Sequence, residues 1–276
     1  MKSTITRPYG LGVINDALRP YGLVLDAVLV TPDADINFSR KSSTVAQHAQ
    51  GFGIVTRELN AVGTALPRAY VVQGNSVVNL AAGDGVTGDE TNPNASGMGL
   101  VQTAEQIGQD LAVGVTFADA PGALVVHVPT GLLAAVSGIG HLLVEGTVPQ
   151  TISLMRQQVE ALGVPFRTQD LKVILAPGAR EGFRIDDAMI DNKLAGIDQA
   201  ILAEVIIRNY GSGDRPHSLD LSLLFMRLWE AANVTVVDFD ERNTLTDEEL
   251  PSKRAADARG EQFYSSGILA GVVRVL

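Results

Sequence analysis

The chain has 276 residues, a net charge of −10 at neutral pH and no cysteine. Its hydrophobic share of 46% and charged share of 19% are those of a globular protein, and the acidic excess argues against a nucleic-acid partner or an anionic membrane surface. The lack of cysteine excludes disulfides, thiolate metal sites and a cysteine nucleophile.

The first third of the chain mixes strand-like and helix-like segments. Residues 1–30 are a candidate N-terminal extension, although branched aliphatic residues at 23–30 predict an early strand. Apolar residues at helical spacing predict a helix over 45–61, and residues 69–80 are typical of a strand, a turn and a second strand. Turn-forming residues fill 81–99 and predict a long loop.

The rest of the chain continues this alternation. Apolar runs predict strands at 111–117, 122–128, 131–137, 171–175 and 234–239. Helical spacing predicts helices at 149–162, at 186–208 (the longest) and from Ser218 to Ala232. Residues 240–262 are charged and predict mostly loop. The apolar closing strand at 267–276 should lie inside a sheet, because a bare edge of this composition aggregates.

The order of these elements predicts the fold class. Runs of consecutive strands separated by isolated helices favour an α+β fold, with a mixed, mainly antiparallel sheet flanked by helices. No linker divides the chain, so we expect a single domain over 1–276. No charge-free apolar run reaches the roughly 18 residues of a membrane span, and the N-terminus has no signal-peptide pattern, so we expect a cytoplasmic protein.

Isolated motifs give weak functional signals. Residues 83–88 spell G-x-G-x-x-G, but an acidic pair and Pro93 follow where a phosphate-binding helix would begin. The four histidines, at 48, 127, 141 and 217, are too few and too scattered to predict a metal site, and we interpret each as structural.

Charged residues near predicted turns are further candidates. Asp119 falls between two strands, where a carboxylate most often serves as a turn former. The arginines at 180, 184, 254 and 259 would make an anion site if they converged in space. A sequence alone does not show such convergence.

Several segments, taken in order, resemble one protein family. The segments are VVQGNSVV (71–78), TFADAPGALVV (116–126), LLAAVSGIGHLLVEGTVPQTI (132–152), LAPGAREGFRI (175–185), HSLDLSLLFMRLWEAANV (217–234) and RNTLTDEELPSKRAAD (242–257). They resemble the Q-V-H-G, T-A-D-C, H-A-G-W and later motifs of the YfiH-like laccase-domain family. Its members are also called polyphenol oxidoreductases, peptidoglycan-editing factors or purine nucleoside phosphorylases. The resemblance covers roughly residues 30–276.

The resemblance implies a site of two histidines and one cysteine that binds zinc or copper and acts on purine nucleosides. Matched to these motifs, the three site positions carry Gln73, Ala120 and Val136 in this sequence. None of these side chains is a thiolate or an imidazole, so the resemblance implies that the metal and the known chemistry are lost. We therefore expect no cofactor.

Two functions remain open at this point. The first is a catalytically degenerate homologue that binds a purine-like small molecule or a protein partner, as a monomer or a homodimer. The alternative is an active enzyme on purine nucleosides or a related small molecule, with a relocated site without cysteine. Its candidate residues are Asp119, His141, Arg180 and Arg254. Whether the chain is an enzyme is left undecided by the sequence.

Overall fold

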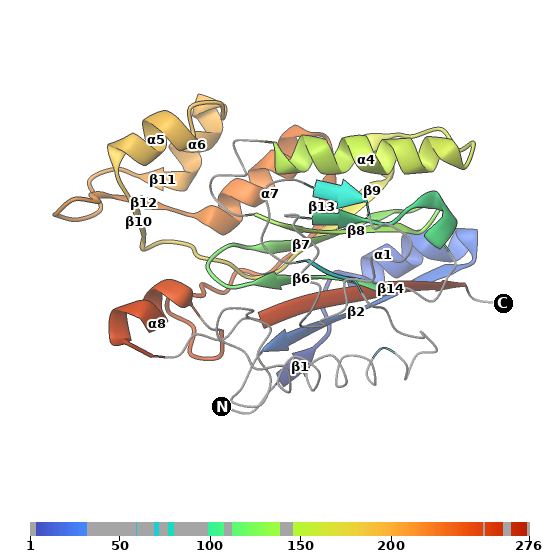
Figure 1. The fold of residues 1–276 in the computed structure, drawn as a ribbon, viewed down its shortest axis with the longest axis horizontal. Helices are drawn as coiled ribbons and strands as arrows, with labels where there is room; N and C mark the ends of the chain where they lie inside the picture. Colours follow the sequence, from blue (N-terminus) through green and yellow to red (C-terminus); the bar gives the residue numbers. More distant parts are fainter. Residues whose placement is uncertain are drawn as a thin grey trace.

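The computed structural model arranges two large sheets and a helical layer one above the other (Figure 1). It describes residues 4–31, 59, 69–71, 77–79, 99–107, 112–138, 146–250, 252–261 and 266–274. The predicted fold class, α+β with mixed and mostly antiparallel sheets, is confirmed.

The first sheet is five-stranded, in the order β1-β2-β14-β6-β3. Its strands are β1 (Thr4–Thr6), β2 (Leu23–Thr31), β3 (Ala69–Val71), β6 (Ala112–Phe117) and β14 (Ser266–Arg274). Only the β3–β6 pair is parallel. Strand β14 is hydrogen-bonded to β2 on one side and to β6 on the other, so the closing strand is central, as predicted.

The second sheet is six-stranded, in the order β13-β9-β7-β8-β5-β4. Its strands are β4 (Val77–Asn79), β5 (Gly99–Val101), β7 (Gly122–His127), β8 (Leu132–Ser137), β9 (Leu171–Leu175) and β13 (Thr235–Phe239). The middle of this sheet, β8–β7–β9, is antiparallel, and parallel strands complete both edges.

The second sheet is buried on both faces, because its side chains alternate between two cores. On β7, Leu124 and Val126 join the cluster between the two sheets, whereas Ala123 and Val125 join the cluster beneath the helices. Strands buried on both faces need a nearly continuous apolar sequence, which explains runs such as 122–126.

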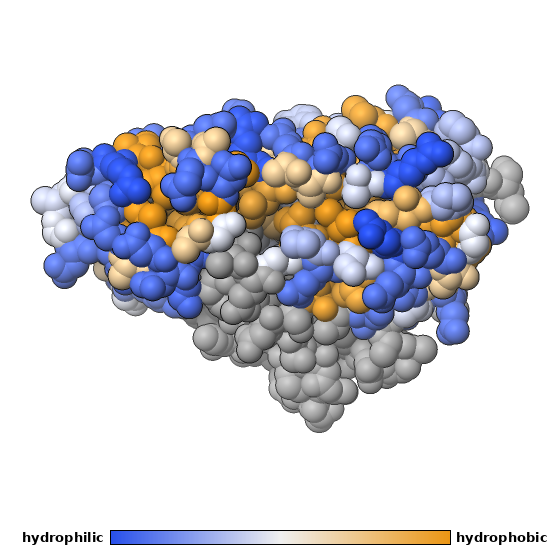
Figure 2. All heavy atoms as spheres, turned by 90° about the horizontal axis from the view of Figure 1, so that it is seen from above, coloured by the Kyte–Doolittle hydropathy of each residue, from blue (hydrophilic) through white to orange (hydrophobic). Residues whose placement is uncertain are grey.

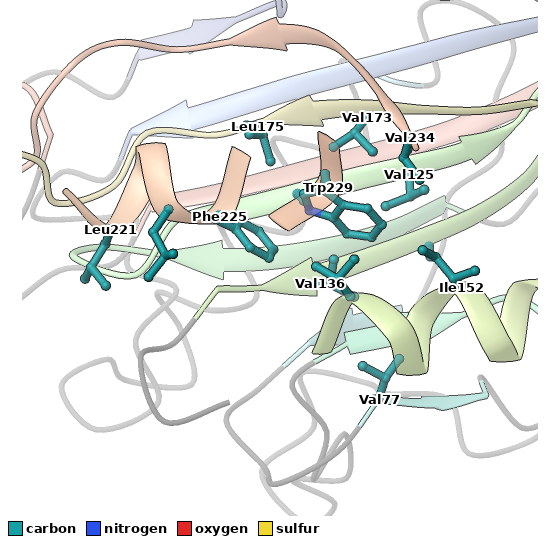
Figure 3. Packing of buried hydrophobic residues seen from close by; sticks show 14 of the residues in the cluster. Val77, Val125, Val136, Ile152, Val173, Leu175, Leu221, Phe225, Trp229 and Val234 are labelled. Atoms are coloured by element: carbon teal, nitrogen blue, oxygen red, sulfur yellow. The ribbon is translucent and has the colours of Figure 1, made fainter. Parts of the chain in front are cut away.

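Two helices cover the outer face of the second sheet. They are α4 (Thr147–Ala161) and α7 (Leu221–Ala231). Figure 3 shows Phe225 and Trp229 of α7 lying over Val125 and Val136, with Ile152 of α4 beside them. Seen from above, this helical face is mostly hydrophilic, with hydrophobic residues in a band between the charged ones (Figure 2).

A smaller unit projects beyond this layer and corrects one prediction. It holds β10 (Phe183–Ile185), α5 (Asp187–Lys193), α6 (Gln199–Val205), β11 (Ile206–Ile207) and β12 (His217–Leu219). The single long helix predicted over 186–208 is therefore wrong. The side chains of Asp186 and Asp198 each accept a backbone N–H and start separate short helices, and the chain between them turns at Gly196.

Two further boundaries differ from prediction. Ser218 lies in β12, and Asp220 caps α7 instead, accepting the N–H of Leu223 at 2.8 Å. The segment predicted as loop after residue 240 contains α8 (Lys253–Arg259), whose first turn is capped by Ser252. Short polar helices of this kind lack the apolar stripe that reveals a helix in sequence.

The remaining predictions have mixed outcomes. Residues 4–31 form β1, α1 (Leu11–Leu18) and β2, so the candidate N-terminal extension contributes two strands to the first sheet.

Short 3₁₀ turns lie at Arg19–Tyr21, Ala104–Gln106 and Thr168–Asp170. The predicted helix at 45–61, apart from residue 59, and the loop at 81–98 lie outside the described residues. In the described part of the chain, no helix is long and apolar enough to cross a membrane.

Candidate functional site

Three connecting segments meet at one end of the sheets, and we call them the loop cluster: 118–121, 176–182 and 240–245. Backbone hydrogen bonds join them. Ala179 donates its N–H to the carbonyl of Asp119 at 2.6 Å, and Thr244 donates to the carbonyl of Gly178 at 3.2 Å. The start of α7 joins as well, since Leu221 donates to the carbonyl of Ala179 at 2.9 Å. The loop cluster is therefore a single connected structure.

Asp119 links the loop cluster to α8. Its Oδ2 accepts the backbone N–H of Arg254 at 3.0 Å, which satisfies one free donor in the first turn of that helix. Its other oxygen, Oδ1, is buried and has no hydrogen-bond partner among the described residues. Asp119 therefore has a role beyond the turn. One carboxylate oxygen holds α8, which is distant in the sequence, and the other has no donor among the described residues.

Arg254 lies half-buried beside this carboxylate. Its guanidinium stacks on the ring of Phe183 at 3.7 Å and donates through Nη1 to the carbonyl of Arg184 at 2.9 Å. Burial lowers the pKa of Arg254 below its ordinary value, and the positive charge of Arg215 lowers it further. The negative charge of Asp119 opposes both effects.

Arg180 belongs to the loop cluster, and its side chain contacts Asp220, Glu241 and Phe239. Its Nε donates to Asp220 at 2.9 Å and its Nη1 donates to the carbonyl of Glu241 at 3.0 Å. The guanidinium also lies over the ring of Phe239 at 5.4 Å. We interpret Arg180 as a structural residue that connects the loop cluster to β13 and α7.

The centre of the loop cluster is tightly packed around Gly178. A Cβ at this position would lie 2.7 Å from Ser222 Oγ and 2.8 Å from the backbone nitrogen of Pro121. Ser222 Oγ and Thr244 Oγ1 are buried and, like Asp119 Oδ1, have no partner in the described part of the chain. All three residues bond through their backbones to the Gly178–Ala179 pair. Unsatisfied polar atoms therefore gather at one point, which is unusual in a folded interior.

Only two of the three positions matched to the family site can be placed. Ala120 lies half-buried in the turn between β6 and β7. Val136 is completely buried in β8 and packs among the apolar side chains beneath the helices (Figure 3). Gln73 and His141 lie outside the described residues. Of the predicted polar groups, Asp119 bonds to the backbone of Arg254, whereas the side chain of Arg180 bonds to Asp220 and Glu241.

The zinc or copper implied by the resemblance does not fit the residues that the structure places. Such metals need several thiolate, imidazole or carboxylate ligands. Within the described ranges, no group of three or more His, Cys, Asp or Glu side chains could hold a metal ion. Ala120 and Val136 supply only methyl groups at the positions matched to two of the ligands.

A cavity of about 560 Å³ opens between the edge strand β1 and the ends of β9 and β13. Its apolar wall consists of Leu29, Ile174, Leu175 and Ile268, and its rim consists of residues 6–9 with Asp238, Asp240 and Arg242.

Each charged side chain of this cavity rim has a partner, and the partners of Arg7 and Asp238 lie outside the rim. Arg242 contacts Asp240 at 2.7 Å, Arg7 contacts the buried Asp26 at 3.1 Å, and Asp238 accepts the N–H of Gly10 at 2.8 Å. The sequence analysis missed this cavity, because its residues come from five separate segments and carry no motif.

Two histidines have structural positions, as expected. His127 is fully buried, its Nδ1 lies 2.9 Å from the hydroxyl of Thr130, and its ring stacks on Phe166. Burial lowers the pKa of His127, and the charge of Asp170 offsets part of that effect. His217 is buried in β12, where its Nδ1 accepts the N–H of Asn209 at 3.2 Å.

The fold itself places the chain in a structural class. The arrangement of two stacked sheets with helices on one face is that of the YfiH-like proteins, which confirms the fold that the resemblance implied. No protein-family model matches the sequence, and no curated protein matches it either.

Three solved structures show this likeness. A Neisseria meningitidis protein, NMB0706 of the DUF152 family, has a TM-score of 0.68 and 17% identity over 90% of this chain and 94% of its own. The Bacillus licheniformis hypothetical protein YfiH has a TM-score of 0.66 and 14% identity, over 90% and 92%. YlmD from Geobacillus stearothermophilus has a TM-score of 0.63 and 16% identity, over 91% and 92%. At these identities the likeness establishes a shared fold.

Proposed function

We propose that this chain is a divergent YfiH-like protein that works by binding and has lost the family's metal-dependent catalysis. The observation that carries the proposal is the complete lack of cysteine, together with alanine and valine at positions 120 and 136. An alanine methyl offers no nucleophile, and a valine neither binds a metal nor accepts a proton. The complete burial of Val136 in an apolar core supports the same interpretation.

The ligand that we propose is a small molecule. Small-molecule sites are concave, occupy about 300–1,000 Å³ and combine apolar walls with a few polar groups. The cavity beside β1 has a volume of about 560 Å³, an apolar wall and a charged rim. The net charge of −10 supports a ligand other than nucleic acid.

Metal content and nucleoside turnover test the loss of catalysis. Purified protein should carry zinc and copper far below one ion per chain. Incubation with adenosine or inosine and phosphate should release no free base, and adenosine should not be deaminated. A stoichiometric transition metal, or turnover well above the blank, would contradict the proposal.

One observation favours the alternative function, an enzyme with a relocated site. The Oδ1 atom of Asp119 is buried and has no hydrogen-bond donor among the described residues, so this acceptor is available to a ligand. If turnover is found, Asp119→Asn and His141→Ala separate the candidates. The asparagine keeps an oxygen for the Arg254 N–H, so a loss of turnover in Asp119→Asn would implicate the carboxylate charge.

A further inference from the structure

Asp238 differs from the other charged residues at the rim of the cavity beside β1. Arg242 contacts Asp240 at 2.7 Å and Arg7 contacts Asp26 at 3.1 Å, so each guanidinium is matched by a carboxylate of its own. Asp238 lines the same cavity and has no cation partner within the described part of the chain. The rim therefore carries a negative charge that its arginines do not balance.

A β-bulge in β13 directs Asp238 toward the cavity. The pairing of β13 with β9 shifts register between Val236 and Asp238. Val236 and Phe239 pack beneath the helices, whereas Val237 packs against the cluster between the two sheets. Positions 236 and 238 of a regular strand would share a face, so the extra residue of the bulge moves Asp238 to the side of the first sheet. The cavity opens on that side, next to Ile174.

The start of α1 holds Asp238 in place without neutralising it. Gly10 precedes the helix, and its N–H donates to Oδ2 of Asp238 at 2.8 Å. A Cβ at Gly10 would lie 2.5 Å from the Cβ of Asp238, so the close approach needs a glycine. A backbone N–H at a helix N-terminus favours an ionised carboxylate but carries only a partial positive charge. The charge of Asp238 is therefore offset only in part.

An apolar wall and an exposed aromatic ring complete the site. Tyr9 lines the cavity and is 97% exposed, so its ring has no role in the packed interior. A carboxylate and an aromatic ring together are suited to an ammonium group, which is attracted to the face of the ring. The aliphatic wall suits an apolar body attached to that group. The wall residues are Leu29, Ile174, Leu175 and Ile268.

We propose that this cavity binds an organic amine, with the ammonium group held by Asp238 and Tyr9 and the apolar body on the aliphatic wall. The inference rests on the binding function proposed above, for which it names the ligand class. The net charge of −10 acts in the same direction, because it attracts cations and repels anions.

Three probes of similar shape and different charge test the ligand class in the intact protein. They are phenethylamine, phenethyl alcohol and hydrocinnamate, which are cationic, neutral and anionic at neutral pH. Calorimetry at fixed ionic strength should show saturable binding of the amine, about 10-fold or more tighter than that of the alcohol. Amine binding should weaken as sodium chloride is raised, and hydrocinnamate should bind most weakly.

Asp238→Asn separates the charge from the fold. The asparagine keeps an oxygen for the N–H of Gly10, so the bulge stays supported while the charge is lost. Amine binding should weaken by about 10-fold, and binding of the alcohol should not change. Asp16→Asn is the matched control, because it removes the same charge from an exposed site on α1 and should bind the amine like the parent.

Tyr9→Ala tests the aromatic ring independently. The exposed ring contributes little to folding, so the variant should fold like the parent and bind the amine about 2–5-fold more weakly. Tyr21→Ala is the control, since that exposed tyrosine does not line the cavity and its loss should leave binding unchanged.

The outcomes are separable from those of the proposed function. Absence of amine binding, tighter binding of the alcohol or of hydrocinnamate, or equal amine binding by the parent and Asp238→Asn overturns the amine site. None of these results alters the metal and turnover measurements. Nucleoside turnover overturns the loss of catalysis, while the amine titration still reports on Asp238.

Discussion

The packed interior and the loop cluster differ in what their buried atoms contact. Between the sheets and beneath the helices, buried side chains are almost all apolar and touch one another. In the loop cluster, polar atoms of Asp119, Ser222 and Thr244 are buried without partners among the described residues, whereas the other such atoms, in Asn79, His127, Trp229 and Ser266, are scattered through the sheets and α7. A buried polar atom without a partner costs about 1–3 kcal/mol. The apolar interior therefore stabilises the fold, and the unpartnered atoms of the loop cluster lower that stability.

This concentration of unpartnered acceptors is the reason for testing Asp119 first if turnover is found. A fold tolerates local cost where a ligand or a reaction needs it, and elsewhere its groups tend to satisfy one another. The unpartnered acceptors of Asp119, Ser222 and Thr244 lie around the Gly178–Ala179 pair, and Asp119 also holds the first turn of α8. Val136, at a position matched to a family ligand, instead lies in a cluster of buried apolar side chains.

The largest expected effect comes from breaking the interior. Phe225→Ala removes a fully buried ring that packs against Trp229, and it should reduce the free energy of unfolding by about 3–5 kcal/mol. Denaturant unfolding measures this change. Leu162→Ala is the control, because that side chain is 42% exposed and its loss should change stability by less than about 0.5 kcal/mol. Similar losses in both variants would contradict the assignment of the core.

A smaller effect is expected at the centre of the loop cluster. Gly178→Ala places a Cβ against Ser222 Oγ and the backbone of Pro121, and it should destabilise the protein by about 1–3 kcal/mol. Gly196→Ala is the matched control, since nothing lies within 4 Å of a Cβ there. That control should be neutral or slightly stabilising. A neutral Gly178→Ala would show that the loop cluster is looser than its contacts indicate.

The smallest expected effect is a pH dependence in the interior. Burial lowers the pKa of His127 in the folded state, so the unfolded chain takes up a proton first as the pH falls. Stability is therefore fully present above the unfolded pKa of about 6.5 and decreases below it, by at most about 1.4 kcal/mol per pH unit for one proton. Denaturant unfolding at pH 7.5 and 5.5 should show a steeper loss in the parent than in His127→Asn. Equal slopes in the two proteins would exclude His127 as the cause.

Sequence patterns predicted two kinds of element correctly. One kind pairs with the strand next to it in the chain, and the other has an apolar composition that suits only a buried position. The central position of β14 followed from its long apolar sequence, because such a strand needs partners on both edges. The hairpin of β7 and β8 followed from two apolar runs separated by a short turn. The helix predicted over 186–208 failed because its apolar spacing continues across Gly196, while the caps at Asp186 and Asp198 divide it.

By itself, the sequence determined the α+β class, the absence of thiol chemistry and the apolar residues at positions 120 and 136. Only the tertiary structure decided that Asp119 bonds to the backbone of Arg254, while Arg180 and Arg259 are held by carboxylates. The reason is physical: side-chain identity and periodicity are local properties, whereas the partner of a charged group depends on which distant segments folding brings to it.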